Sequence, residues 1–166
     1  QRTIRNKITA TGVGLHSGKK VTLTFHPADV NTGIIFRRID GEKVIEIPAL
    51  AKYVGDTTLS TSLEKDGYKI STIEHLLSAI AGTGVDNCVI DCDGPEIPVM
   101  DGSSTEFVFL IQSAGIMEQD AAKKFIYVTK SVQVSREDAV ARINPYEGFR
   151  VTFTVDFDHP VYKKYP

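Results

Sequence analysis

The hydrophobic pattern of the first seventy residues is that of short β-strands. Residues 20–26 (KVTLTFH) alternate apolar and polar side chains, and residues 33–39 (GIIFRRI) follow the turn sequence ADVNTG. Residues 44–49 add a strand, and residues 58–70 add a pair joined by a turn at KDG, residues 65–67. This part of the chain is therefore predicted to be rich in β-structure.

A helical period replaces this alternation after residue 70. Four apolar residues recur at the spacing of one helix face: Ile73, Leu76, Leu77 and Ile80. Ser71 and Glu74 fit a capping box, in which the Ser71 hydroxyl and the Glu74 carboxylate accept hydrogen bonds from each other's backbone N–H. Gly82 is a natural C-terminal stop. We therefore expect a helix over residues 71–81.

The remaining pattern adds strands and one more helix. A strand is predicted over residues 87–92, then a connection rich in proline and glycine. A second helix is predicted over residues 104–114, capped by Ser103 or Ser104 and ended by Gly115. Three further strands are predicted within residues 125–134, 139–145 and 149–157, with no helix to cover them.

This order of elements predicts an α+β fold. Residues 1–118 are expected to form a two-layer domain, a sheet with two helices. Residues 119–166 are expected to be the opening strands of a second, similar domain, because a three-stranded meander with one apolar face needs something to pack on. We therefore expect the chain to be part of a longer protein.

Composition narrows the classes of partner. The chain has 166 residues, a net charge of −2, 42% hydrophobic and 24% charged residues, which is typical of a globular protein. No basic cluster exceeds a dipeptide, which argues against a nucleic-acid partner. No apolar run approaches the roughly 20 residues that span a bilayer, so no membrane span is expected.

The two cysteines, Cys88 and Cys92, are four residues apart in a predicted strand. Strand geometry separates their Cα atoms by about 13 Å. A disulfide needs less than about 7 Å. We therefore expect two unpaired thiols on small, semi-buried side chains.

Glu74 and His75 are the strongest chemical candidates, and each has two interpretations. Glu74 is either a capping residue or a catalytic carboxylate. His75 lies roughly opposite the apolar face, so it is either a solvated surface histidine or a metal ligand. A catalytic zinc needs three protein ligands, and Ser78 and Ala79 follow at i+3 and i+4. Any further ligands must therefore come from elsewhere.

Three other segments carry polar groups. Residues 11–20 (TGVGLHSGKK) contain His16 among three glycines, which suits a hairpin loop or close approach to a ligand, although the Walker A pattern is absent. Residues 95–104 hold Glu96 and Asp101 and are expected to be a rigid connection with a turn that leads to the helix cap. Residues 155–160 (VDFDHP) end a predicted strand.

Five segments, in order and at the same spacing, resemble the bacterial UDP-3-O-acyl-N-acetylglucosamine deacetylases of lipid A synthesis. They are residues 1–21, 70–87 (ISTIEHLLSAIAGTGVDN), 95–116 (PEIPVMDGSSTEFVFLIQSAGI), 121–126 and 153–160. The resemblance implies a cytoplasmic enzyme, monomeric at full length. It has two α+β domains packed helices to helices, with the active site between them. It removes acetate from UDP-3-O-(3-hydroxyacyl)-N-acetylglucosamine.

The resemblance also implies roles for single residues. One zinc ion is held by two His and one Asp; His75 matches one ligand and Glu74 matches the catalytic carboxylate. The other two ligands belong to a His-Lys-x-x-x-Asp segment that this sequence lacks. Leu15, His16, Leu59 and Ser60 match positions near the mouth of the site. Many members have Cys at the position of Ser60, where a thiolate could bind a second, inhibitory zinc.

Near the end of the chain, Asp156 and Phe157 match an acidic–Phe pair that contacts the uridine. By itself the chain is expected to be inactive, with the missing C-terminal half of the protein as its partner. The alternative is a non-catalytic module that binds nucleotide sugars or serves assembly. The two hypotheses predict different zinc stoichiometry and different acetate release.

Overall fold

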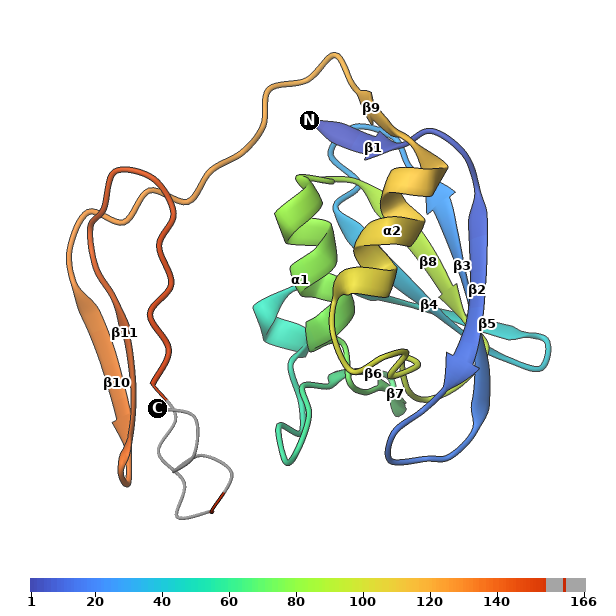
Figure 1. Cartoon of the computed structure of the whole chain (residues 1–166), viewed down its shortest axis with the longest axis horizontal. Coiled ribbons are helices and arrows are strands. Elements are labelled where there is room, and N and C mark those ends of the chain that lie inside the picture. Colours follow the sequence, from blue (N-terminus) through green and yellow to red (C-terminus); the bar gives the residue numbers. More distant parts are fainter. Residues whose placement is uncertain (155–159, 161–166) are drawn as a thin grey trace. The chain divides into compact units, whose positions relative to one another are not determined.

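The computed structural model describes residues 1–154 and 160. The chain divides into two compact units, Gln1–Lys124 and Phe125–Pro166, each with its own internal contacts. Each unit is described by itself (Figure 1).

Unit 1 is built on a five-stranded mixed sheet with the order β2-β3-β8-β4-β5. Neighbouring strands are antiparallel except β4 and β8, which are parallel. The strands are β2 (Ile8–Val13), β3 (Lys20–Pro27), β4 (Ile34–Asp40), β5 (Lys43–Pro48) and β8 (Cys88–Cys92). The predicted strands at β3, β4, β5 and β8 are confirmed; β2 was not predicted as a strand.

The strand register explains where the core lies. Phe25, Ile90, Phe36 and Ile47 are paired in sequence across β3, β8, β4 and β5, and all are buried. Because side chains alternate along a strand, this row lies on one face of the sheet. The same core cluster contains buried side chains of both helices, so the helices cover this face (Figure 1).

The helices are α1 (Glu74–Thr83) and α2 (Thr105–Ala114). Each buries three residues toward the core: Leu76, Ala79 and Ile80 from α1, and Phe107, Ile111 and Ala114 from α2. Two helices on one face of a mixed sheet form the α+β architecture that the pattern of elements predicted.

Both predicted ends of the first helix are wrong. The helix begins at Glu74, because Thr72 has a left-handed φ of 58° and cannot continue a helix through Ser71. The Ser71 N–H and hydroxyl both donate to Pro95 O, so Ser71 forms no capping box. The helix ends at Thr83, and the following Gly84, with a φ of 73°, donates its N–H to Ala81 O. Gly82 lies inside the last turn.

The second helix matches its prediction closely. It begins after Ser104 and ends at Gly115. The Ser103 hydroxyl accepts a hydrogen bond from the Thr105 N–H at 3.0 Å, one of the two capping alternatives.

Smaller elements complete unit 1. β1 (Arg2–Ile4) pairs with β9 (Ile116–Glu118), and neither was predicted. A 3₁₀ helix, η1, covers Ala51–Tyr53. β6 (Leu63–Lys65) and β7 (Tyr68–Ile70) form the predicted hairpin. Its turn residues Asp66 and Gly67 have φ values of 52° and 79°, as a type I′ turn requires.

Cys88 and Cys92 are buried and unpaired, which confirms the prediction from their spacing. Burial raises the pKa of the Cys88 thiol to about 12 and that of Cys92 to about 11. Both side chains therefore act as small apolar groups of the core.

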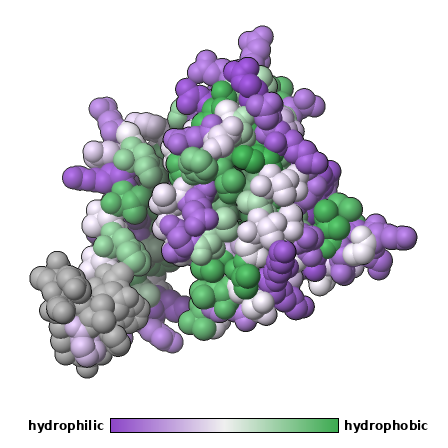
Figure 2. Space-filling model, turned by 45° about the vertical axis from the view of Figure 1, so that its right-hand side comes forward, coloured by the Kyte–Doolittle hydropathy of each residue, from purple (hydrophilic) through white to green (hydrophobic). Residues whose placement is uncertain are grey.

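The described part of unit 2 contains one antiparallel hairpin, β10 (Val132–Arg136) and β11 (Ala139–Ile143). These strands fall within or beside the first two predicted ones, whereas residues 149–154 of the third predicted strand are not a strand. All residues of β10 and β11 are exposed. Figure 2 shows hydrophobic side chains at the surface of both units. No helix within the described residues is long and apolar enough to cross a membrane.

Candidate functional site

The first turn of α1 holds Glu74 and His75. Leu76, Ala79 and Ile80 of this helix face the core, whereas Glu74 and His75 are only half-buried. His75 is therefore not a core histidine, as its position on the helical wheel predicted. Because adjacent helical residues point about 100° apart, the two side chains can address different parts of one ligand.

The Glu74 carboxylate binds a neighbouring loop instead of the start of its own helix. Its Oε2 accepts a hydrogen bond from the Thr61 N–H at 3.0 Å. In return, the Ile73 N–H donates to Thr61 O at 3.2 Å. This two-way link fixes residue 61 against the start of α1. Leu59 and Ser60 directly precede Thr61 in the sequence, so the structure brings this segment of the loop to Glu74.

The loop that carries Leu59 and Ser60 is ordered by Asp56. The Asp56 carboxylate accepts hydrogen bonds from the Thr58 N–H at 2.9 Å and from Lys69 Nζ at 3.2 Å. The bonds from Thr58, with a smaller effect of Lys69, lower the pKa of Asp56 from 3.8 to about 2. Leu59 itself is 85% exposed and has a positive φ of 60°.

A second loop, residues 14–19, connects β2 to β3, as the hairpin interpretation predicted. The Gly14 N–H donates to Lys19 O at 2.9 Å, and Leu15 and His16 are exposed at the tip. Glu96 holds this loop in place. Its carboxylate accepts hydrogen bonds from the N–H groups of His16 at 2.9 Å and Ser17 at 2.8 Å.

Glu96 also reaches the chain that leads into α1. Its Oε1 accepts a hydrogen bond from the Thr72 hydroxyl at 3.1 Å. The structure thus connects the loop with Leu15 and His16 to the residues before Glu74 through one buried carboxylate. Glu96 was expected only to be part of a rigid connection, and these hydrogen bonds were not predicted.

The connection before α2 also reaches the first turn of α1. Hydrogen bonds from the N–H and hydroxyl of Ser103 lower the pKa of Asp101, and the electrostatic effect of nearby His75 lowers it further. The Ser78 hydroxyl is hydrogen-bonded to His75 O and to the Ser104 hydroxyl. These contacts tie the starts of the two helices together beside His75.

Three residues of the same segments have a strained backbone. Leu59, Thr72 and Met100 all have φ values between 54° and 60°, which side chains other than glycine rarely adopt. Each such residue costs on the order of 1–3 kcal/mol and persists only where its surroundings hold it. Strained residues of this kind are frequent at functional sites.

The described residues do not contain a complete metal site. Within residues 1–154 and 160, no group of three His, Cys, Asp or Glu side chains could hold a metal ion. His75 offers one imidazole donor on an accessible helix turn, which fits a single zinc ligand. Asp156 and Phe157, the residues matched to the uridine end, lie outside the described residues.

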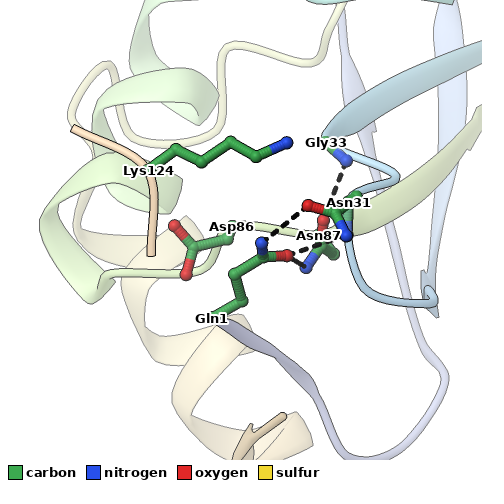
Figure 3. Close-up of a pocket in the computed structure, with 6 residues that line it drawn as sticks. All are labelled: Gln1, Asn31, Gly33, Asp86, Asn87 and Lys124. Carbon is green, nitrogen blue, oxygen red and sulfur yellow. Dashed lines mark hydrogen bonds between the residues drawn. The ribbon is translucent and has the colours of Figure 1, made fainter. Parts of the chain in front are cut away.

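A small polar pocket lies elsewhere in unit 1 (Figure 3). It is lined by Gln1, Asn31, Gly33, Asp86, Asn87 and Lys124. The Asn87 side-chain amide donates a hydrogen bond to Gln1 Oε1 at 2.8 Å. Asp86 and Asn87 follow the C-terminal end of α1, whereas Glu74 begins the helix about 15 Å away. The pocket is therefore separate from the candidate site.

Comparisons with known proteins identify the family to which the chain belongs. A family model described as "LpxC: UDP-3-O-acyl N-acetylglycosamine deacetylase" matches residues 1–165. Relatives named UDP-3-O-acyl-N-acetylglucosamine deacetylase are 60% identical over 163 residues in Saccharophagus degradans and in Hahella chejuensis, and 56% identical over 166 residues in Legionella pneumophila. The alignments cover 98%, 98% and 100% of this chain and 54%, 54% and 55% of the relatives. The chain thus spans about half the length of the curated relatives that it matches.

Proposed function

Because the chain belongs to the family of UDP-3-O-acyl N-acetylglycosamine deacetylases, we propose that it supplies part of the active site of such an enzyme. The reaction is hydrolysis of the N-acetyl group of UDP-3-O-(3-hydroxyacyl)-N-acetylglucosamine, with release of acetate, in lipid A synthesis. The observation that carries the proposal is the first turn of α1, where a carboxylate anchored by Thr61 stands beside an imidazole that faces away from the core.

Glu74 is proposed as the general base. Amide hydrolysis needs a group that takes a proton from the attacking water and then returns one to the leaving nitrogen. The Thr61 N–H holds Oε2 of the carboxylate. Within residues 1–154, Oε1 accepts no hydrogen bond, so it is the atom proposed to receive the proton. The link to Thr61 fixes the direction in which that oxygen points.

His75 is proposed as a zinc ligand. A bound zinc ion with an open position would polarise the amide carbonyl and acidify the attacking water. One imidazole alone does not make such a site, and the described residues supply no group of three ligands. The other two ligands are therefore proposed to come from a His-Lys-x-x-x-Asp segment in the C-terminal half of the intact protein.

The two loops beside α1 are proposed to contact the substrate. Leu15, His16 and Leu59 are exposed and Ser60 is half-buried, so their side chains are available to a ligand. Asp156 and Phe157 are proposed for the uridine end. We also propose that the part of residues 119–166 that lies in unit 2, Phe125–Pro166, belongs to a second domain, and that the intact protein is cytoplasmic and monomeric.

The proposal is tested by two substitutions in the intact protein. Glu74→Gln should lower kcat for acetate release by about 10²- to 10⁴-fold, as loss of a general base does, while zinc content stays unchanged. His75→Ala should lose both zinc and activity. Glu106→Gln is the matched control, because Glu106 is an exposed acidic residue in the first turn of the other helix. Near-normal turnover by Glu74→Gln would remove Glu74 from the chemistry.

A second candidate function is a non-catalytic module that binds nucleotide sugars or serves assembly. It is favoured because no group of three side chains that could hold a metal ion lies within residues 1–154 and 160. Zinc stoichiometry and acetate release by the 166-residue chain separate the two. We expect the chain alone to bind zinc weakly and to release no acetate, and full turnover would overturn that expectation.

A further inference from the structure

Glu96 is a buried carboxylate that the proposed reaction does not use. Its side chain is 1% exposed, and it lies outside the helices and strands, between Pro95 and Pro98. Burying a charge is unfavourable unless hydrogen bonds replace its water. Three donors do so here: the N–H groups of His16 and Ser17 and the hydroxyl of Thr72.

The donors hold the carboxylate in its charged form. Burial raises the pKa of Glu96, but the hydrogen bonds from His16, Ser17 and Thr72 outweigh it, and the pKa lies below its usual range. None of the ion pairs found within the described residues involves Glu96. The charge is therefore matched by neutral donors from two separate segments, which makes it a connector between them.

The backbone around Glu96 strengthens this connection. The Ser71 N–H donates to Pro95 O and the Ile97 N–H donates to Ser71 O, both at 2.9 Å. Residues 95–97 and 71 thus pair like a short parallel strand, and the Glu96 side chain extends from this pair to the loop. Gly14 leaves the space for it, since a Cβ there would lie 2.4 Å from Glu96 Oε2.

Thr72 connects this arrangement to the start of α1. Its left-handed φ of 58° sets the direction in which the chain enters the helix, two residues before Glu74. A β-branched residue rarely adopts this conformation, and its hydroxyl is the group that Glu96 binds. Loss of the Glu96 carboxylate would therefore affect the loop and the start of the helix together.

We propose that Glu96 is a positioning residue that sets the distance between the loop of Leu15 and His16 and the first turn of α1. The inference rests on the proposed function, in which the loop contacts the substrate and Glu74 is the base. The Glu96 carboxylate then keeps the loop that contacts the substrate at a fixed distance from the base.

Glu96→Gln in the intact enzyme tests the proposal. The amide has nearly the same shape, but its NH₂ group must face one of the N–H donors, so at least one of the three bonds is lost. We expect kcat/KM for deacetylation to fall about tenfold to a hundredfold, with both KM and kcat affected, at temperatures where the variant is fully folded. Zinc content should not change.

Gly14→Ala provides an independent perturbation, because the added Cβ would displace the carboxylate from the loop without removing it. Its effect and that of Glu96→Gln should be far from additive in the double variant, since both break the same contact. This variant also carries the test if Glu96→Gln does not fold. Asp91→Asn is the matched control: Asp91 accepts hydrogen bonds from His26 and Arg37 on the sheet face away from the helices. It should leave kcat/KM unchanged.

Amide hydrogen exchange in the 166-residue chain separates the possible failures. Glu96→Gln should expose the His16 and Ser17 amides to faster exchange whether or not the chain is part of a deacetylase. Unchanged protection of both amides would overturn the positioning role. Faster exchange with normal kinetics in the intact enzyme would overturn it as well. An intact wild-type protein that releases no acetate would instead refute the proposed function.

Discussion

The two units of this chain contain the same kind of strand pattern with opposite results. In unit 1, Phe36, Ile47 and Ile90 are completely buried. In unit 2, Val134 is 68% exposed and Ile143 60%. Both sets lie in segments whose pattern of apolar and polar residues predicts strands. The difference is that α1 and α2 cover the sheet of unit 1, whereas the hairpin of unit 2 has no covering layer among the described residues.

The hairpin nevertheless has a defined apolar face. Its register pairs Val132 with Ile143 and Val134 with Ala141, so four apolar side chains lie on one side. An isolated two-stranded hairpin is marginally stable in water. This face is what the proposed second domain would need to cover. We therefore expect unit 1, and not the hairpin, to fold by itself.

Removing a core ring should have the largest effect and should separate the units most clearly. Phe36→Ala leaves a cavity in the hydrophobic core, because Phe36 is 0% exposed. We expect the free energy of unfolding to fall by about 3–5 kcal/mol. Phe149→Ala in unit 2, where the ring is 93% exposed, should change it by less than about 0.5 kcal/mol. Urea unfolding of the 166-residue chain measures both, and equal losses would erase the contrast between the units.

A glycine in α1 tests the corrected end of that helix. Gly82 is inside the helix, exposed, and has open space around its Cβ position, so Gly82→Ala should stabilise unit 1 by about 0.4–1 kcal/mol. Gly84→Ala should destabilise it, because Gly84 has a φ of 73°. Thermal unfolding of both variants shows whether each substitution stabilises or destabilises unit 1. Destabilisation by Gly82→Ala would restore the stop predicted from sequence.

Acid should act on unit 1 through Asp56. The pKa of Asp56 is lowered from 3.8 to about 2 in the folded state. The ionised carboxylate therefore contributes to the free energy of unfolding fully above about pH 4, and this contribution is lost as the pH falls through 2. The Thr58 amide resonance should therefore shift between pH 4 and 2 as the loop of residues 55–62 loosens. Asp56→Asn should flatten this dependence. A Thr58 titration near pH 4 in the wild type would contradict the lowered pKa.

Ending the chain at Lys124 should have the smallest effect. Contacts cluster separately in the two units, so the shortened chain should unfold with the same urea midpoint as the full 166 residues. The isolated segment 125–166 should show no cooperative transition by circular dichroism. A large drop in the midpoint of the shortened chain would mean that unit 1 depends on unit 2.

The parts of the fold that sequence predicted are those with local causes. β3, β4, β5 and α2 follow from alternation, helical period and nearby turn or cap residues. The start of α1 was mispredicted because the Ser71–Glu74 pattern is local, whereas Ser71 is bound by Pro95, 24 residues away. β1 and β9 pair the two ends of unit 1, and nothing in three residues signals a partner more than a hundred residues distant.

The candidate site divides in the same way. His75 was placed off the core face by helical geometry alone, and the resemblance to the deacetylases proposed its role and that of Glu74. The links to Thr61 and Glu96 were missed, because a hydrogen bond across 13 or 80 residues has no periodicity. The one available signal was an acidic residue enclosed by Pro95, Ile97 and Pro98 in an otherwise apolar stretch.

The buried cysteines have a practical consequence for probing this site. Thiolates, not thiols, react with alkylating labels. The raised pKa values keep the thiols of Cys88 and Cys92 protonated, and burial shields both side chains in the native state. The chain has no other cysteine. A spin label or fluorophore on Ser60→Cys would therefore report on the loop beside Glu74 without any need to remove the natural thiols.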